Sequence, residues 1–175
     1  MRLINPNPFT TRPEIVGTFG VVTTTHWIAT GVGMGILERG GNAFDAAVAT
    51  AFTLQVVEPH LCGPGGDVPL ILNAVKRGKT EVICGQGSMP AGATIAHYKG
   101  LGLDLIPGTG LLAACIPGTF DAYMLVLRDY GTMRVADVLS PASRKPWTRR
   151  SVAFKALPAV VVVSTRRHWP RAASV

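Results

Sequence analysis

The chain has 175 residues, 47% of them apolar, and a mean hydropathy of +0.31, which excludes an intrinsically disordered chain and allows one domain with a core. The net charge of +7 is unevenly placed. Residues 144–175 hold eight of the 17 lysines and arginines and no acid, whereas residues 1–143 hold nine basic residues against all ten acids. The basic character therefore belongs to the C-terminal tail and not to the part that can form a core.

The first elements are predicted from proline, glycine and apolar spacing. Three prolines make residues 1–15 an extended arm, and β-prone residues predict a strand over 16–24. Apolar residues at helical spacing predict a helix over 28–37, which Thr24 or Thr25 is suited to cap.

A second helix, over residues 43–57, is the best-marked element of the sequence. Gly40-Gly41 ends the preceding helix, and Asn42 is suited to cap the new one. Asp45 places negative charge near the positive end of the helix dipole, and Pro59 stops the helix. Its many alanines predict close packing on a sheet.

The remaining elements complete an α/β pattern without an internal repeat. They are expected in the order strand, strand, helix, helix: residues 68–75, 80–84, 119–130 and 135–139. Arg77-Gly78-Lys79 predicts a hairpin turn between the two strands. Thr132 is suited to cap the last helix, which should end before Pro141.

The sequence predicts no disulfide framework, no metal site and no membrane-spanning segment. The three cysteines are widely spaced and predict no disulfide framework, and His60-x-Cys62 is only half of a metal pattern, so no metal is expected. The apolar run at 156–163 contains a proline and is too short to span a bilayer. Because the N-terminus lacks an apolar signal core, we expect a cytoplasmic protein with no membrane segment.

Three stretches together resemble one known family. They are a Thr-His turn at Thr25-His26, Gly-Gly-Asn-Ala-x-Asp-Ala-Ala-Val-Ala at 40–49, and Glu58-Pro59 before the glycine-rich loop 62–66. In this order they resemble the start of the large subunit in the γ-glutamyltransferase (γ-glutamyl transpeptidase) family. The resemblance continues through Gly-Thr-x-x-x-x-x-x-Leu-x-Pro-Ala at 131–142. It therefore covers residues 16–142.

The resemblance implies a fold and a reaction. The fold is the four-layer αββα sandwich of N-terminal-nucleophile hydrolases, of which this α/β (α+β) chain would hold an incomplete part. In the family, a precursor cleaves itself, and the freed N-terminal Thr of the small subunit attacks an amide carbonyl of a small γ-glutamyl or acyl amide. The acyl group then passes to water or to another amine. No cofactor is implied.

The resemblance places that threonine in a half of the family chain that nothing in this sequence resembles. No catalytic residue is therefore assigned here, the small subunit is expected as a missing partner, and the chain alone is expected to be inactive. An unpartnered part of such a sandwich is also expected to be poorly soluble.

Gln86 is the one candidate substrate-binding residue. The family's large subunit holds the α-carboxylate of the substrate with an arginine in Asp-x-Arg-Glu-x-Ala-Pro. Aligned on Pro90, this chain has Gln86 at that position, and residues 65–69 depart from the family's run of glycines. A neutral amide cannot replace a charged, bidentate guanidinium. Both changes favour an acylase-like branch over a glutathione-cleaving one.

Beyond Ala142 the resemblance and the acids stop together. We expect residues 143–175 to be an unrelated and disordered basic tail, with a reading-frame artefact or a truncated, decayed copy as the hypothesis. The alternative is a non-catalytic α/β interaction protein whose basic tail binds polyanions. Trp147 and Trp169 are too few and too irregular for a nucleic-acid module, so nucleic-acid binding is not expected.

Two further patterns have simpler explanations than a functional site. Gly108-x-Gly110-x-x-Ala113 fits a loose dinucleotide fingerprint, but Pro107 stands where a strand should lead into it. His26 lies at a helix start, where a capping or packing role is expected in place of a catalytic one.

Overall fold

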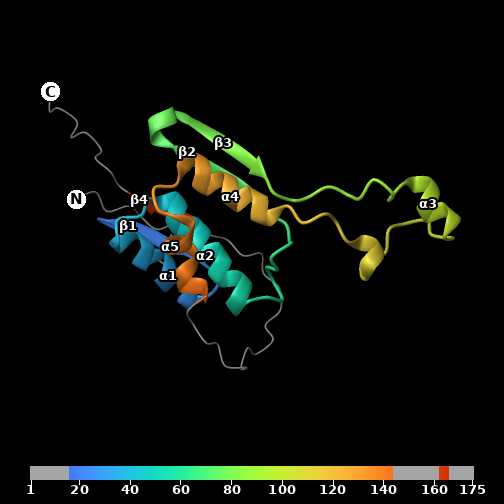
Figure 1. The fold of residues 1–175 in the computed structure, drawn as a ribbon, viewed down its shortest axis with the longest axis horizontal. Helices are drawn as coiled ribbons and strands as arrows, with labels where there is room; N and C mark the ends of the chain where they lie inside the picture. The colour runs from blue at the N-terminus through green and yellow to red at the C-terminus, as the bar shows by residue number, and fades with distance from the viewer. Residues whose placement is uncertain (1–15, 144–161, 166–175) are drawn as a thin grey trace, which may run out of the picture.

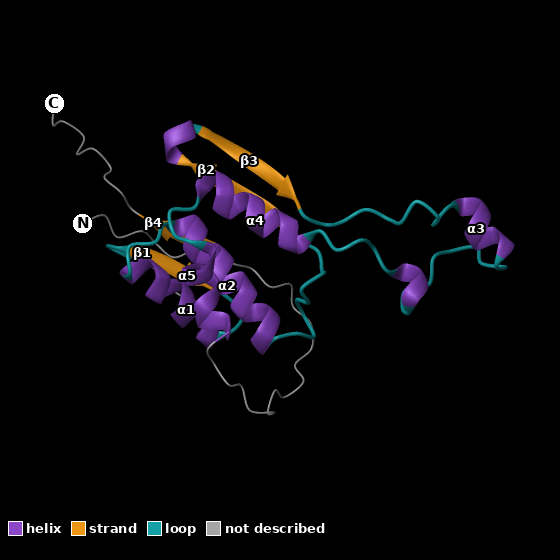
Figure 2. Ribbon diagram, viewed as in Figure 1, coloured by secondary structure: helices purple, strands orange, loops and turns teal. Residues whose placement is uncertain are grey.

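The computed structural model describes residues 16–143 and 162–165 (Figure 1). The chain is a mixture of helices and strands (Figure 2). Their bounds are β1 Gly20–Thr23, α1 Trp27–Glu38, α2 Ala43–Val57, β2 Pro69–Ala74, η1 Val75–Arg77, β3 Lys79–Cys84, α3 Ile95–Gly100, η2 Leu111–Ala113, α4 Thr119–Tyr130, α5 Val135–Ser143 and β4 Val162–Thr165. Among these residues no helix is long and apolar enough to cross a bilayer.

Helix α2 lies at the centre of the packed body and contacts α1, α4 and α5 (Figure 1). Its small side chains let the neighbouring helices approach closely. Ala46 and Ala49 are completely buried in these contacts. The largest fully buried side chains are Ile36 of α1, Leu54 of α2 itself and Val138 of α5. The helix that the sequence marks best is thus the one on which the body packs.

Two buried threonines satisfy their hydroxyls inside α2. Thr50 Oγ1 donates to the Ala46 carbonyl at 2.6 Å, and Thr53 Oγ1 donates to the Ala49 carbonyl at 2.7 Å. A buried hydroxyl without a partner would be costly, so these bonds make threonine acceptable within an apolar contact.

The start of α2 is closed as expected and also tied to a distant segment. Asn42 Oδ1 accepts from the amides of Phe44 and Asp45, and Asp45 Oδ2 accepts from the Asn42 amide at 2.9 Å, which makes a capping box. The Asn42 side-chain amide then donates to the Tyr130 carbonyl at 2.7 Å. The cap of α2 therefore holds the end of α4.

Thr132 corrects one expectation. It does not cap α5: its amide donates to both Asp45 carboxylate oxygens, and its hydroxyl donates to Oδ2 at 2.7 Å. The Met133 amide donates to Oδ1 at 3.2 Å. The buried carboxylate of Asp45 attracts these donors because it would otherwise lie uncompensated in the core.

Two more expectations at helix ends are wrong. His26, not Thr24 or Thr25, is the N-cap of α1, and its Nδ1 accepts from the Ile28 amide at 3.3 Å. The last helix, α5, continues past Pro141 to Ser143. A proline lacks one amide donor, and near a helix end the loss of one such bond does not stop the helix.

The predicted hairpin is confirmed. Strands β2 and β3 pair antiparallel with Ile71 opposite Val82, and Gly78 adopts a φ of 65° at the turn. That left-handed conformation favours glycine. In the described residues β2 and β3 form a sheet of two strands only.

A short strand lies within the expected basic tail. Residues 162–165 form β4, which pairs antiparallel with β1, with Val22 opposite Val163. At these four residues the chain is extended and paired, where the sequence predicted disorder. Three of the four are β-branched, which favours a strand beside the exposed edge of β1. The rest of the tail and the N-terminal residues 1–15 lie outside the described residues.

Residues 88–116, which we call the arm, project from the body between β3 and α4 (Figures 1 and 2). The arm contains α3 and η2 near its tip. Tyr98 is buried inside it, and its hydroxyl donates to the Leu112 carbonyl at 2.7 Å. The Leu103 amide donates to the Tyr98 carbonyl at 3.0 Å. Tyr98 thus joins α3 to η2 at the tip of the arm.

Candidate functional site

Gln86 lies where β3 passes into the arm. The ladder between the strands extends one residue pair beyond their bounds, because the Gly85 amide donates to the Val68 carbonyl at 2.9 Å. Gly87 then turns the chain with a φ of 76°. The Gln86 side chain between them is exposed to solvent. The local backbone therefore presents this side chain outward.

The root of the arm is a close contact between two backbones. The Ile116 amide donates to the Ser88 carbonyl at 2.9 Å. A Cβ added to Gly87 would lie 1.9 Å from the Ile116 carbonyl oxygen, and one added to Gly118 would lie 2.7 Å from the Gly87 amide nitrogen. Only glycine fits at either place, so the two backbone segments of the root, around Gly87 and Gly118, lie against each other beside Gln86.

Cys84 contacts the Gln86 amide. Its Sγ lies 3.5 Å from Gln86 Oε1, with the thiol as donor and the amide oxygen as acceptor. That contact leaves the two amide hydrogens of Gln86 as donors for another group. The arrangement suits a neutral or weakly polar acceptor, and it lacks the charge with which an arginine would hold a carboxylate.

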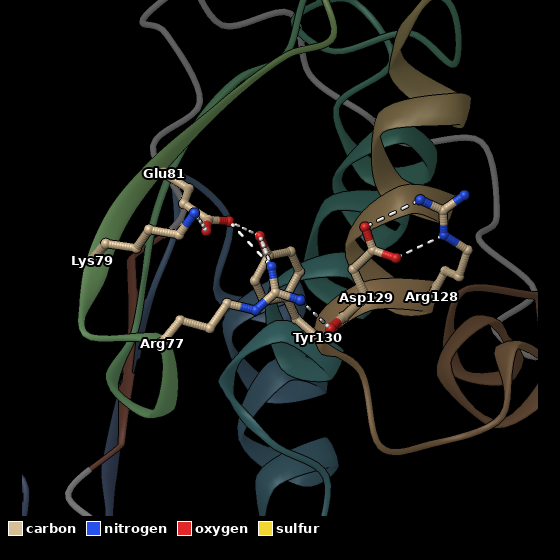
Figure 3. A network of polar contacts seen from close by, with 6 residues as sticks. All are labelled: Arg77, Lys79, Glu81, Arg128, Asp129 and Tyr130. Carbon is tan, nitrogen blue, oxygen red and sulfur yellow. Dashed lines mark hydrogen bonds and ion pairs between the residues drawn. The ribbon is translucent and has the colours of Figure 1, made fainter.

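The hairpin that carries Gln86 is attached to α4 through Arg77 (Figure 3). Arg77 Nη1 donates to the Tyr130 hydroxyl at 3.1 Å, and Nη2 donates to the Asp129 carbonyl at 3.2 Å. The guanidinium carbon also lies 4.2 Å from the centre of the Tyr130 ring. No local pattern in the sequence predicts this network, because Arg77 lies about 50 positions from Asp129 and Tyr130 along the chain.

Glu81 is the acid of that network (Figure 3). Lys79 Nζ lies 2.7 Å from its Oε1, Arg77 lies 3.5 Å from its Oε2, and the Tyr130 hydroxyl donates to Oε2. The hydrogen bond from Lys79, followed by the charges of Lys79 and Arg77, lowers the pKa of the Glu81 carboxyl below its ordinary value. The group is therefore ionised and serves as an acceptor between the hairpin and α4.

None of the described side chains forms an activated nucleophile. Burial, and then the charge of Glu58, raise the pKa of the Cys62 thiol, so a thiolate is disfavoured. Burial raises the pKa of Tyr123 to about 12. Thr25 donates to Glu58 Oε2, but it lies inside the chain and has no free α-amine to act as a base. The expectation that no catalytic residue lies here thus remains a prediction, supported by these contacts.

The structure explains the glycine pattern at 108–113 and the position of His26. Gly110 lies in the arm with a φ of 89° and leads into the single turn η2, so no strand–turn–helix unit forms there. His26 is the cap described above, as expected for a histidine at a helix start. In the part of the chain that the structure describes, no group of three potential metal ligands occurs.

A depression of the surface lies between α1 and α5, away from Gln86. It has a volume of about 350 Å³ and is lined by Trp27, Ile28, Gly31, Val32, Gly35, Arg39 and Pro141. None of these residues belongs to β3 or to the arm. The candidate substrate-binding residue therefore lies on an open surface of the described residues.

Known proteins resemble this chain over most of its described part. The family model described as Gamma-glutamyltranspeptidase matches residues 29–145. The glutathione hydrolase-like YwrD proenzyme of Bacillus subtilis (strain 168) is 40% identical over 130 residues, which cover 74% of this chain and 24% of that protein.

Two solved structures agree with the fold. LmbA2991HD is 64% identical, with a TM-score of 0.71, and the match covers 77% of this chain and 23% of the solved one. The cephalosporin acylase from Bacillus halodurans is 32% identical, with a TM-score of 0.68, and the match covers 81% and 27%. The chain thus spans about a quarter of the length of these relatives.

These matches confirm the resemblance found in the sequence and the expected α/β fold class. The structure holds an incomplete part of the N-terminal-nucleophile hydrolase fold that its solved relatives share. The family match begins within α1 and ends just after α5, so it includes α2, the hairpin, Gln86 and the arm. The chain therefore belongs to the gamma-glutamyltranspeptidase family.

Proposed function

We propose that this chain forms the N-terminal part of the large subunit of an amidohydrolase that acts on a small γ-glutamyl or related acyl amide. The match of residues 29–145 to the family carries the proposal. It is supported by the names of two relatives, a glutathione hydrolase-like proenzyme and a cephalosporin acylase. The activity belongs to the assembled protein, and this chain alone is inactive.

In the proposed reaction the nucleophile is an N-terminal threonine outside this chain. Its hydroxyl oxygen attacks the amide carbonyl while its α-amine takes the hydroxyl proton and then gives it to the leaving amine. Water or a second amine next attacks the acyl-enzyme ester and releases the threonine. The role of this chain is to hold the acyl group, and Gln86 is the residue assigned to that contact.

Gln86 directs the proposal towards an acylase-like preference. Its exposed amide, whose oxygen contacts the Cys84 thiol, offers neutral donors where the family's arginine offers a charged pair. The substrate preferred here is therefore an acyl amide without the free α-carboxylate of a γ-glutamyl group. The departure at residues 65–69 supports the same preference.

The first test concerns the chain alone, assayed with γ-glutamyl-p-nitroanilide and with a glutaryl amide. No product is expected, because the described residues hold no nucleophile with a base. Steady turnover that disappears when one side chain of this chain is changed would show that the nucleophile does not lie outside this chain, and the proposal would be wrong.

The second test concerns Gln86 in an assembled enzyme, made by co-expressing this chain with the remaining three quarters of the 64% identical relative. Gln86→Arg should raise kcat/KM for γ-glutamyl-p-nitroanilide about tenfold relative to the analogue whose α-carboxylate is a carboxamide, because a charge-assisted bond replaces a neutral one. Ser88→Arg, equally exposed on the same root, is the matched control and should leave the ratio unchanged. Equal ratios in all three proteins would remove Gln86 from the substrate site.

The basic tail supports a second candidate, a non-catalytic protein that binds polyanions, because residues 144–175 hold eight basic residues and no acid. Salt-dependent retention on heparin would favour it. We propose instead that the tail is not family sequence, and the end of the family match at residue 145 supports this. A family-like continuation in another frame of the coding DNA is expected.

A further inference from the structure

The depression between α1 and α5, which we call the groove, follows one side of α1. Four of its lining residues are four positions apart and form a row along the helix and its C-cap: Trp27, Gly31, Gly35 and Arg39. At the rise of an α-helix this row is about 18 Å long. The volume of about 350 Å³ is therefore elongated. It lies within the range of small-molecule sites.

The floor of the groove is formed by glycines. A Cβ added to Gly31 would meet no atom within 4 Å, so no packing contact requires glycine there. Glycine is disfavoured inside a helix relative to alanine. Beside this floor, Ile28 and Val32 provide apolar walls that also belong to the core. The missing side chains keep an apolar channel open along the surface of α1.

The two ends of the groove differ in chemistry. Trp27 is 78% exposed and gives one end an apolar indole ring. At the other end the Arg39 side chain lies back along the helix, because its Nη1 is 3.5 Å from the Cβ position of Gly35. From Gly35 to Trp27 the distance along the helix is about 12 Å. A molecule that matches both ends is apolar over this length and polar at one end.

Arg39 determines the charge of that polar end. Among the described residues its guanidinium forms no ion pair. The nearby acid, Asp137, is already bound, because Arg134 Nε and Nη2 donate to its two oxygens at 2.8 and 3.1 Å. The hydrogen bond from Arg134, followed by the charges of Arg134 and Arg39, lowers the pKa of the Asp137 carboxyl. Two cations therefore meet one acid here, and a carboxylate complements the excess positive charge.

We propose that the groove binds a medium-chain aliphatic carboxylate, with its carboxylate at Arg39 and its alkyl chain along the glycine floor towards Trp27. An extended decanoate spans this length and covers the apolar walls. The basic tail is a poor occupant, because residues 144–175 hold eight basic residues and no acid and would meet a guanidinium. The site goes beyond the proposed function, since none of its lining residues lies in β3 or the arm.

Calorimetric titration of the full chain with decanoate tests the groove. One saturable site with a Kd of about 0.1 mM is expected for a ligand of this size. Gly31→Leu should weaken binding at least about tenfold, because leucine fills the floor. The position is open, so the variant is expected to fold, which circular dichroism checks. Gly92→Leu is the matched control, since Gly92 is equally open but lies in the arm. Equal affinity of wild type and Gly31→Leu overturns the site.

Arg39→Gln tests the polar end. It should weaken binding of decanoate about tenfold and leave binding of neutral 1-decanol unchanged, because only the anion loses a charge-assisted contact. Arg128→Gln removes the same charge from the exposed face of α4 and should affect neither ligand. If both arginine variants weaken decanoate equally, net charge and not Arg39 attracts the ligand, and the proposal is wrong.

An anionic membrane presents the same chemistry as a free carboxylate, and phosphatidylglycerol vesicles distinguish the two. Vesicle binding that is lost in Gly31→Leu and Arg39→Gln, without saturable binding of decanoate, would identify a membrane surface as the occupant and overturn the proposal. Failure of the wild type to bind decanoate overturns it as well. These measurements use the chain alone and no amide substrate, so their outcome is independent of the proposed function.

Discussion

Asp45 shows how much of this fold depends on one side chain. Its carboxylate is fully buried and accepts from the Asn42 amide, the Thr132 amide and hydroxyl, and the Met133 amide. A carboxylate in the core is tolerated only when such donors surround it. The same contacts fix the turn between α4 and α5 against the start of α2.

Replacement of Asp45 by Asn should therefore lower the free energy of unfolding by about 3 kcal/mol, because charge-assisted bonds are lost and one amide hydrogen faces donors. Urea denaturation followed by circular dichroism measures the change. Asp121→Asn is the control, since Asp121 lies exposed in the first turn of α4 and contributes about 0.5 kcal/mol through the helix dipole. Equal losses in the two variants would contradict the role assigned to Asp45.

At the residue scale the sequence predicted the local roles of Asn42 and Asp45 but not the contacts that they make with distant residues. Asn42 was predicted as a cap because it directly precedes the helix, and Asp45 was singled out because its charge favours the positive end of the helix dipole. The reciprocal hydrogen bonds between them were not predicted. Thr132 was assigned to the wrong helix because its true partner lies 87 positions away. Gln86 was located by alignment on Pro90, but neither its exposure nor its contact with Cys84 follows from spacing.

Among the elements, α1 packs through one glycine and not through another. A Cβ at Gly33 would lie 2.3 Å from Thr50 Oγ1 and 2.8 Å from Val22 Cγ1, whereas one at Gly31 would meet nothing within 4 Å. Thr50 cannot move aside easily because it is buried and its hydroxyl is bonded to the Ala46 carbonyl. Gly33 is thus a position where α1 approaches α2 and β1 closely.

The pair offers a matched test within one helix. Gly33→Ala should lower the free energy of unfolding by about 2 kcal/mol, because the new methyl group overpacks the contact. Gly31→Ala should raise it by about 0.5–1 kcal/mol, because alanine favours the helix and the position is open. Urea denaturation midpoints of both variants give the comparison. A gain in stability for Gly33→Ala would show that the contact is looser than the structure has it.

The helices and the hairpin were predictable because periodicity and turn residues are local signals. The end of α5 was not, since Pro141 signals a stop that the packing of α5 on α2 overrides. The projection of the arm from the body and its exposed leucines depend on the whole fold, so no local signal predicts them.

For the molecule as a whole, the hairpin leaves one apolar face open. Ile71 and Val82 lie opposite each other on β2 and β3 and are 78% and 71% exposed. In the described residues this sheet has two strands, so both of its edges are unpaired there. Exposed apolar faces and open strand edges promote association between copies.

Ile71→Lys should therefore reduce association of the purified chain, because a charge on this face opposes stacking of one sheet on another. Sedimentation velocity over a range of concentrations should show a higher fraction of monomer than in wild type. Asn73→Lys is the control: Asn73 is exposed on the same strand and already polar, so its replacement should change the fraction little. If the control reduces association equally, net charge and not the apolar face controls the behaviour.

At this largest scale the sequence predicted the family and the fold class, because several motifs along 16–142 follow the order in which the family has them. It did not predict that residues 162–165 return to pair with β1, since nothing local in a strand specifies which edge it joins.

The backbone contact at Gly87 and Gly118 has a mechanical consequence. A Cβ at Gly87 would lie 1.9 Å from the Ile116 carbonyl oxygen, and one at Gly118 would lie 2.7 Å from the Gly87 amide nitrogen. A larger residue at either position would therefore push the two segments apart next to Gln86. Substitution of a glycine that has no side chain to offer a substrate would then displace the candidate substrate-binding amide.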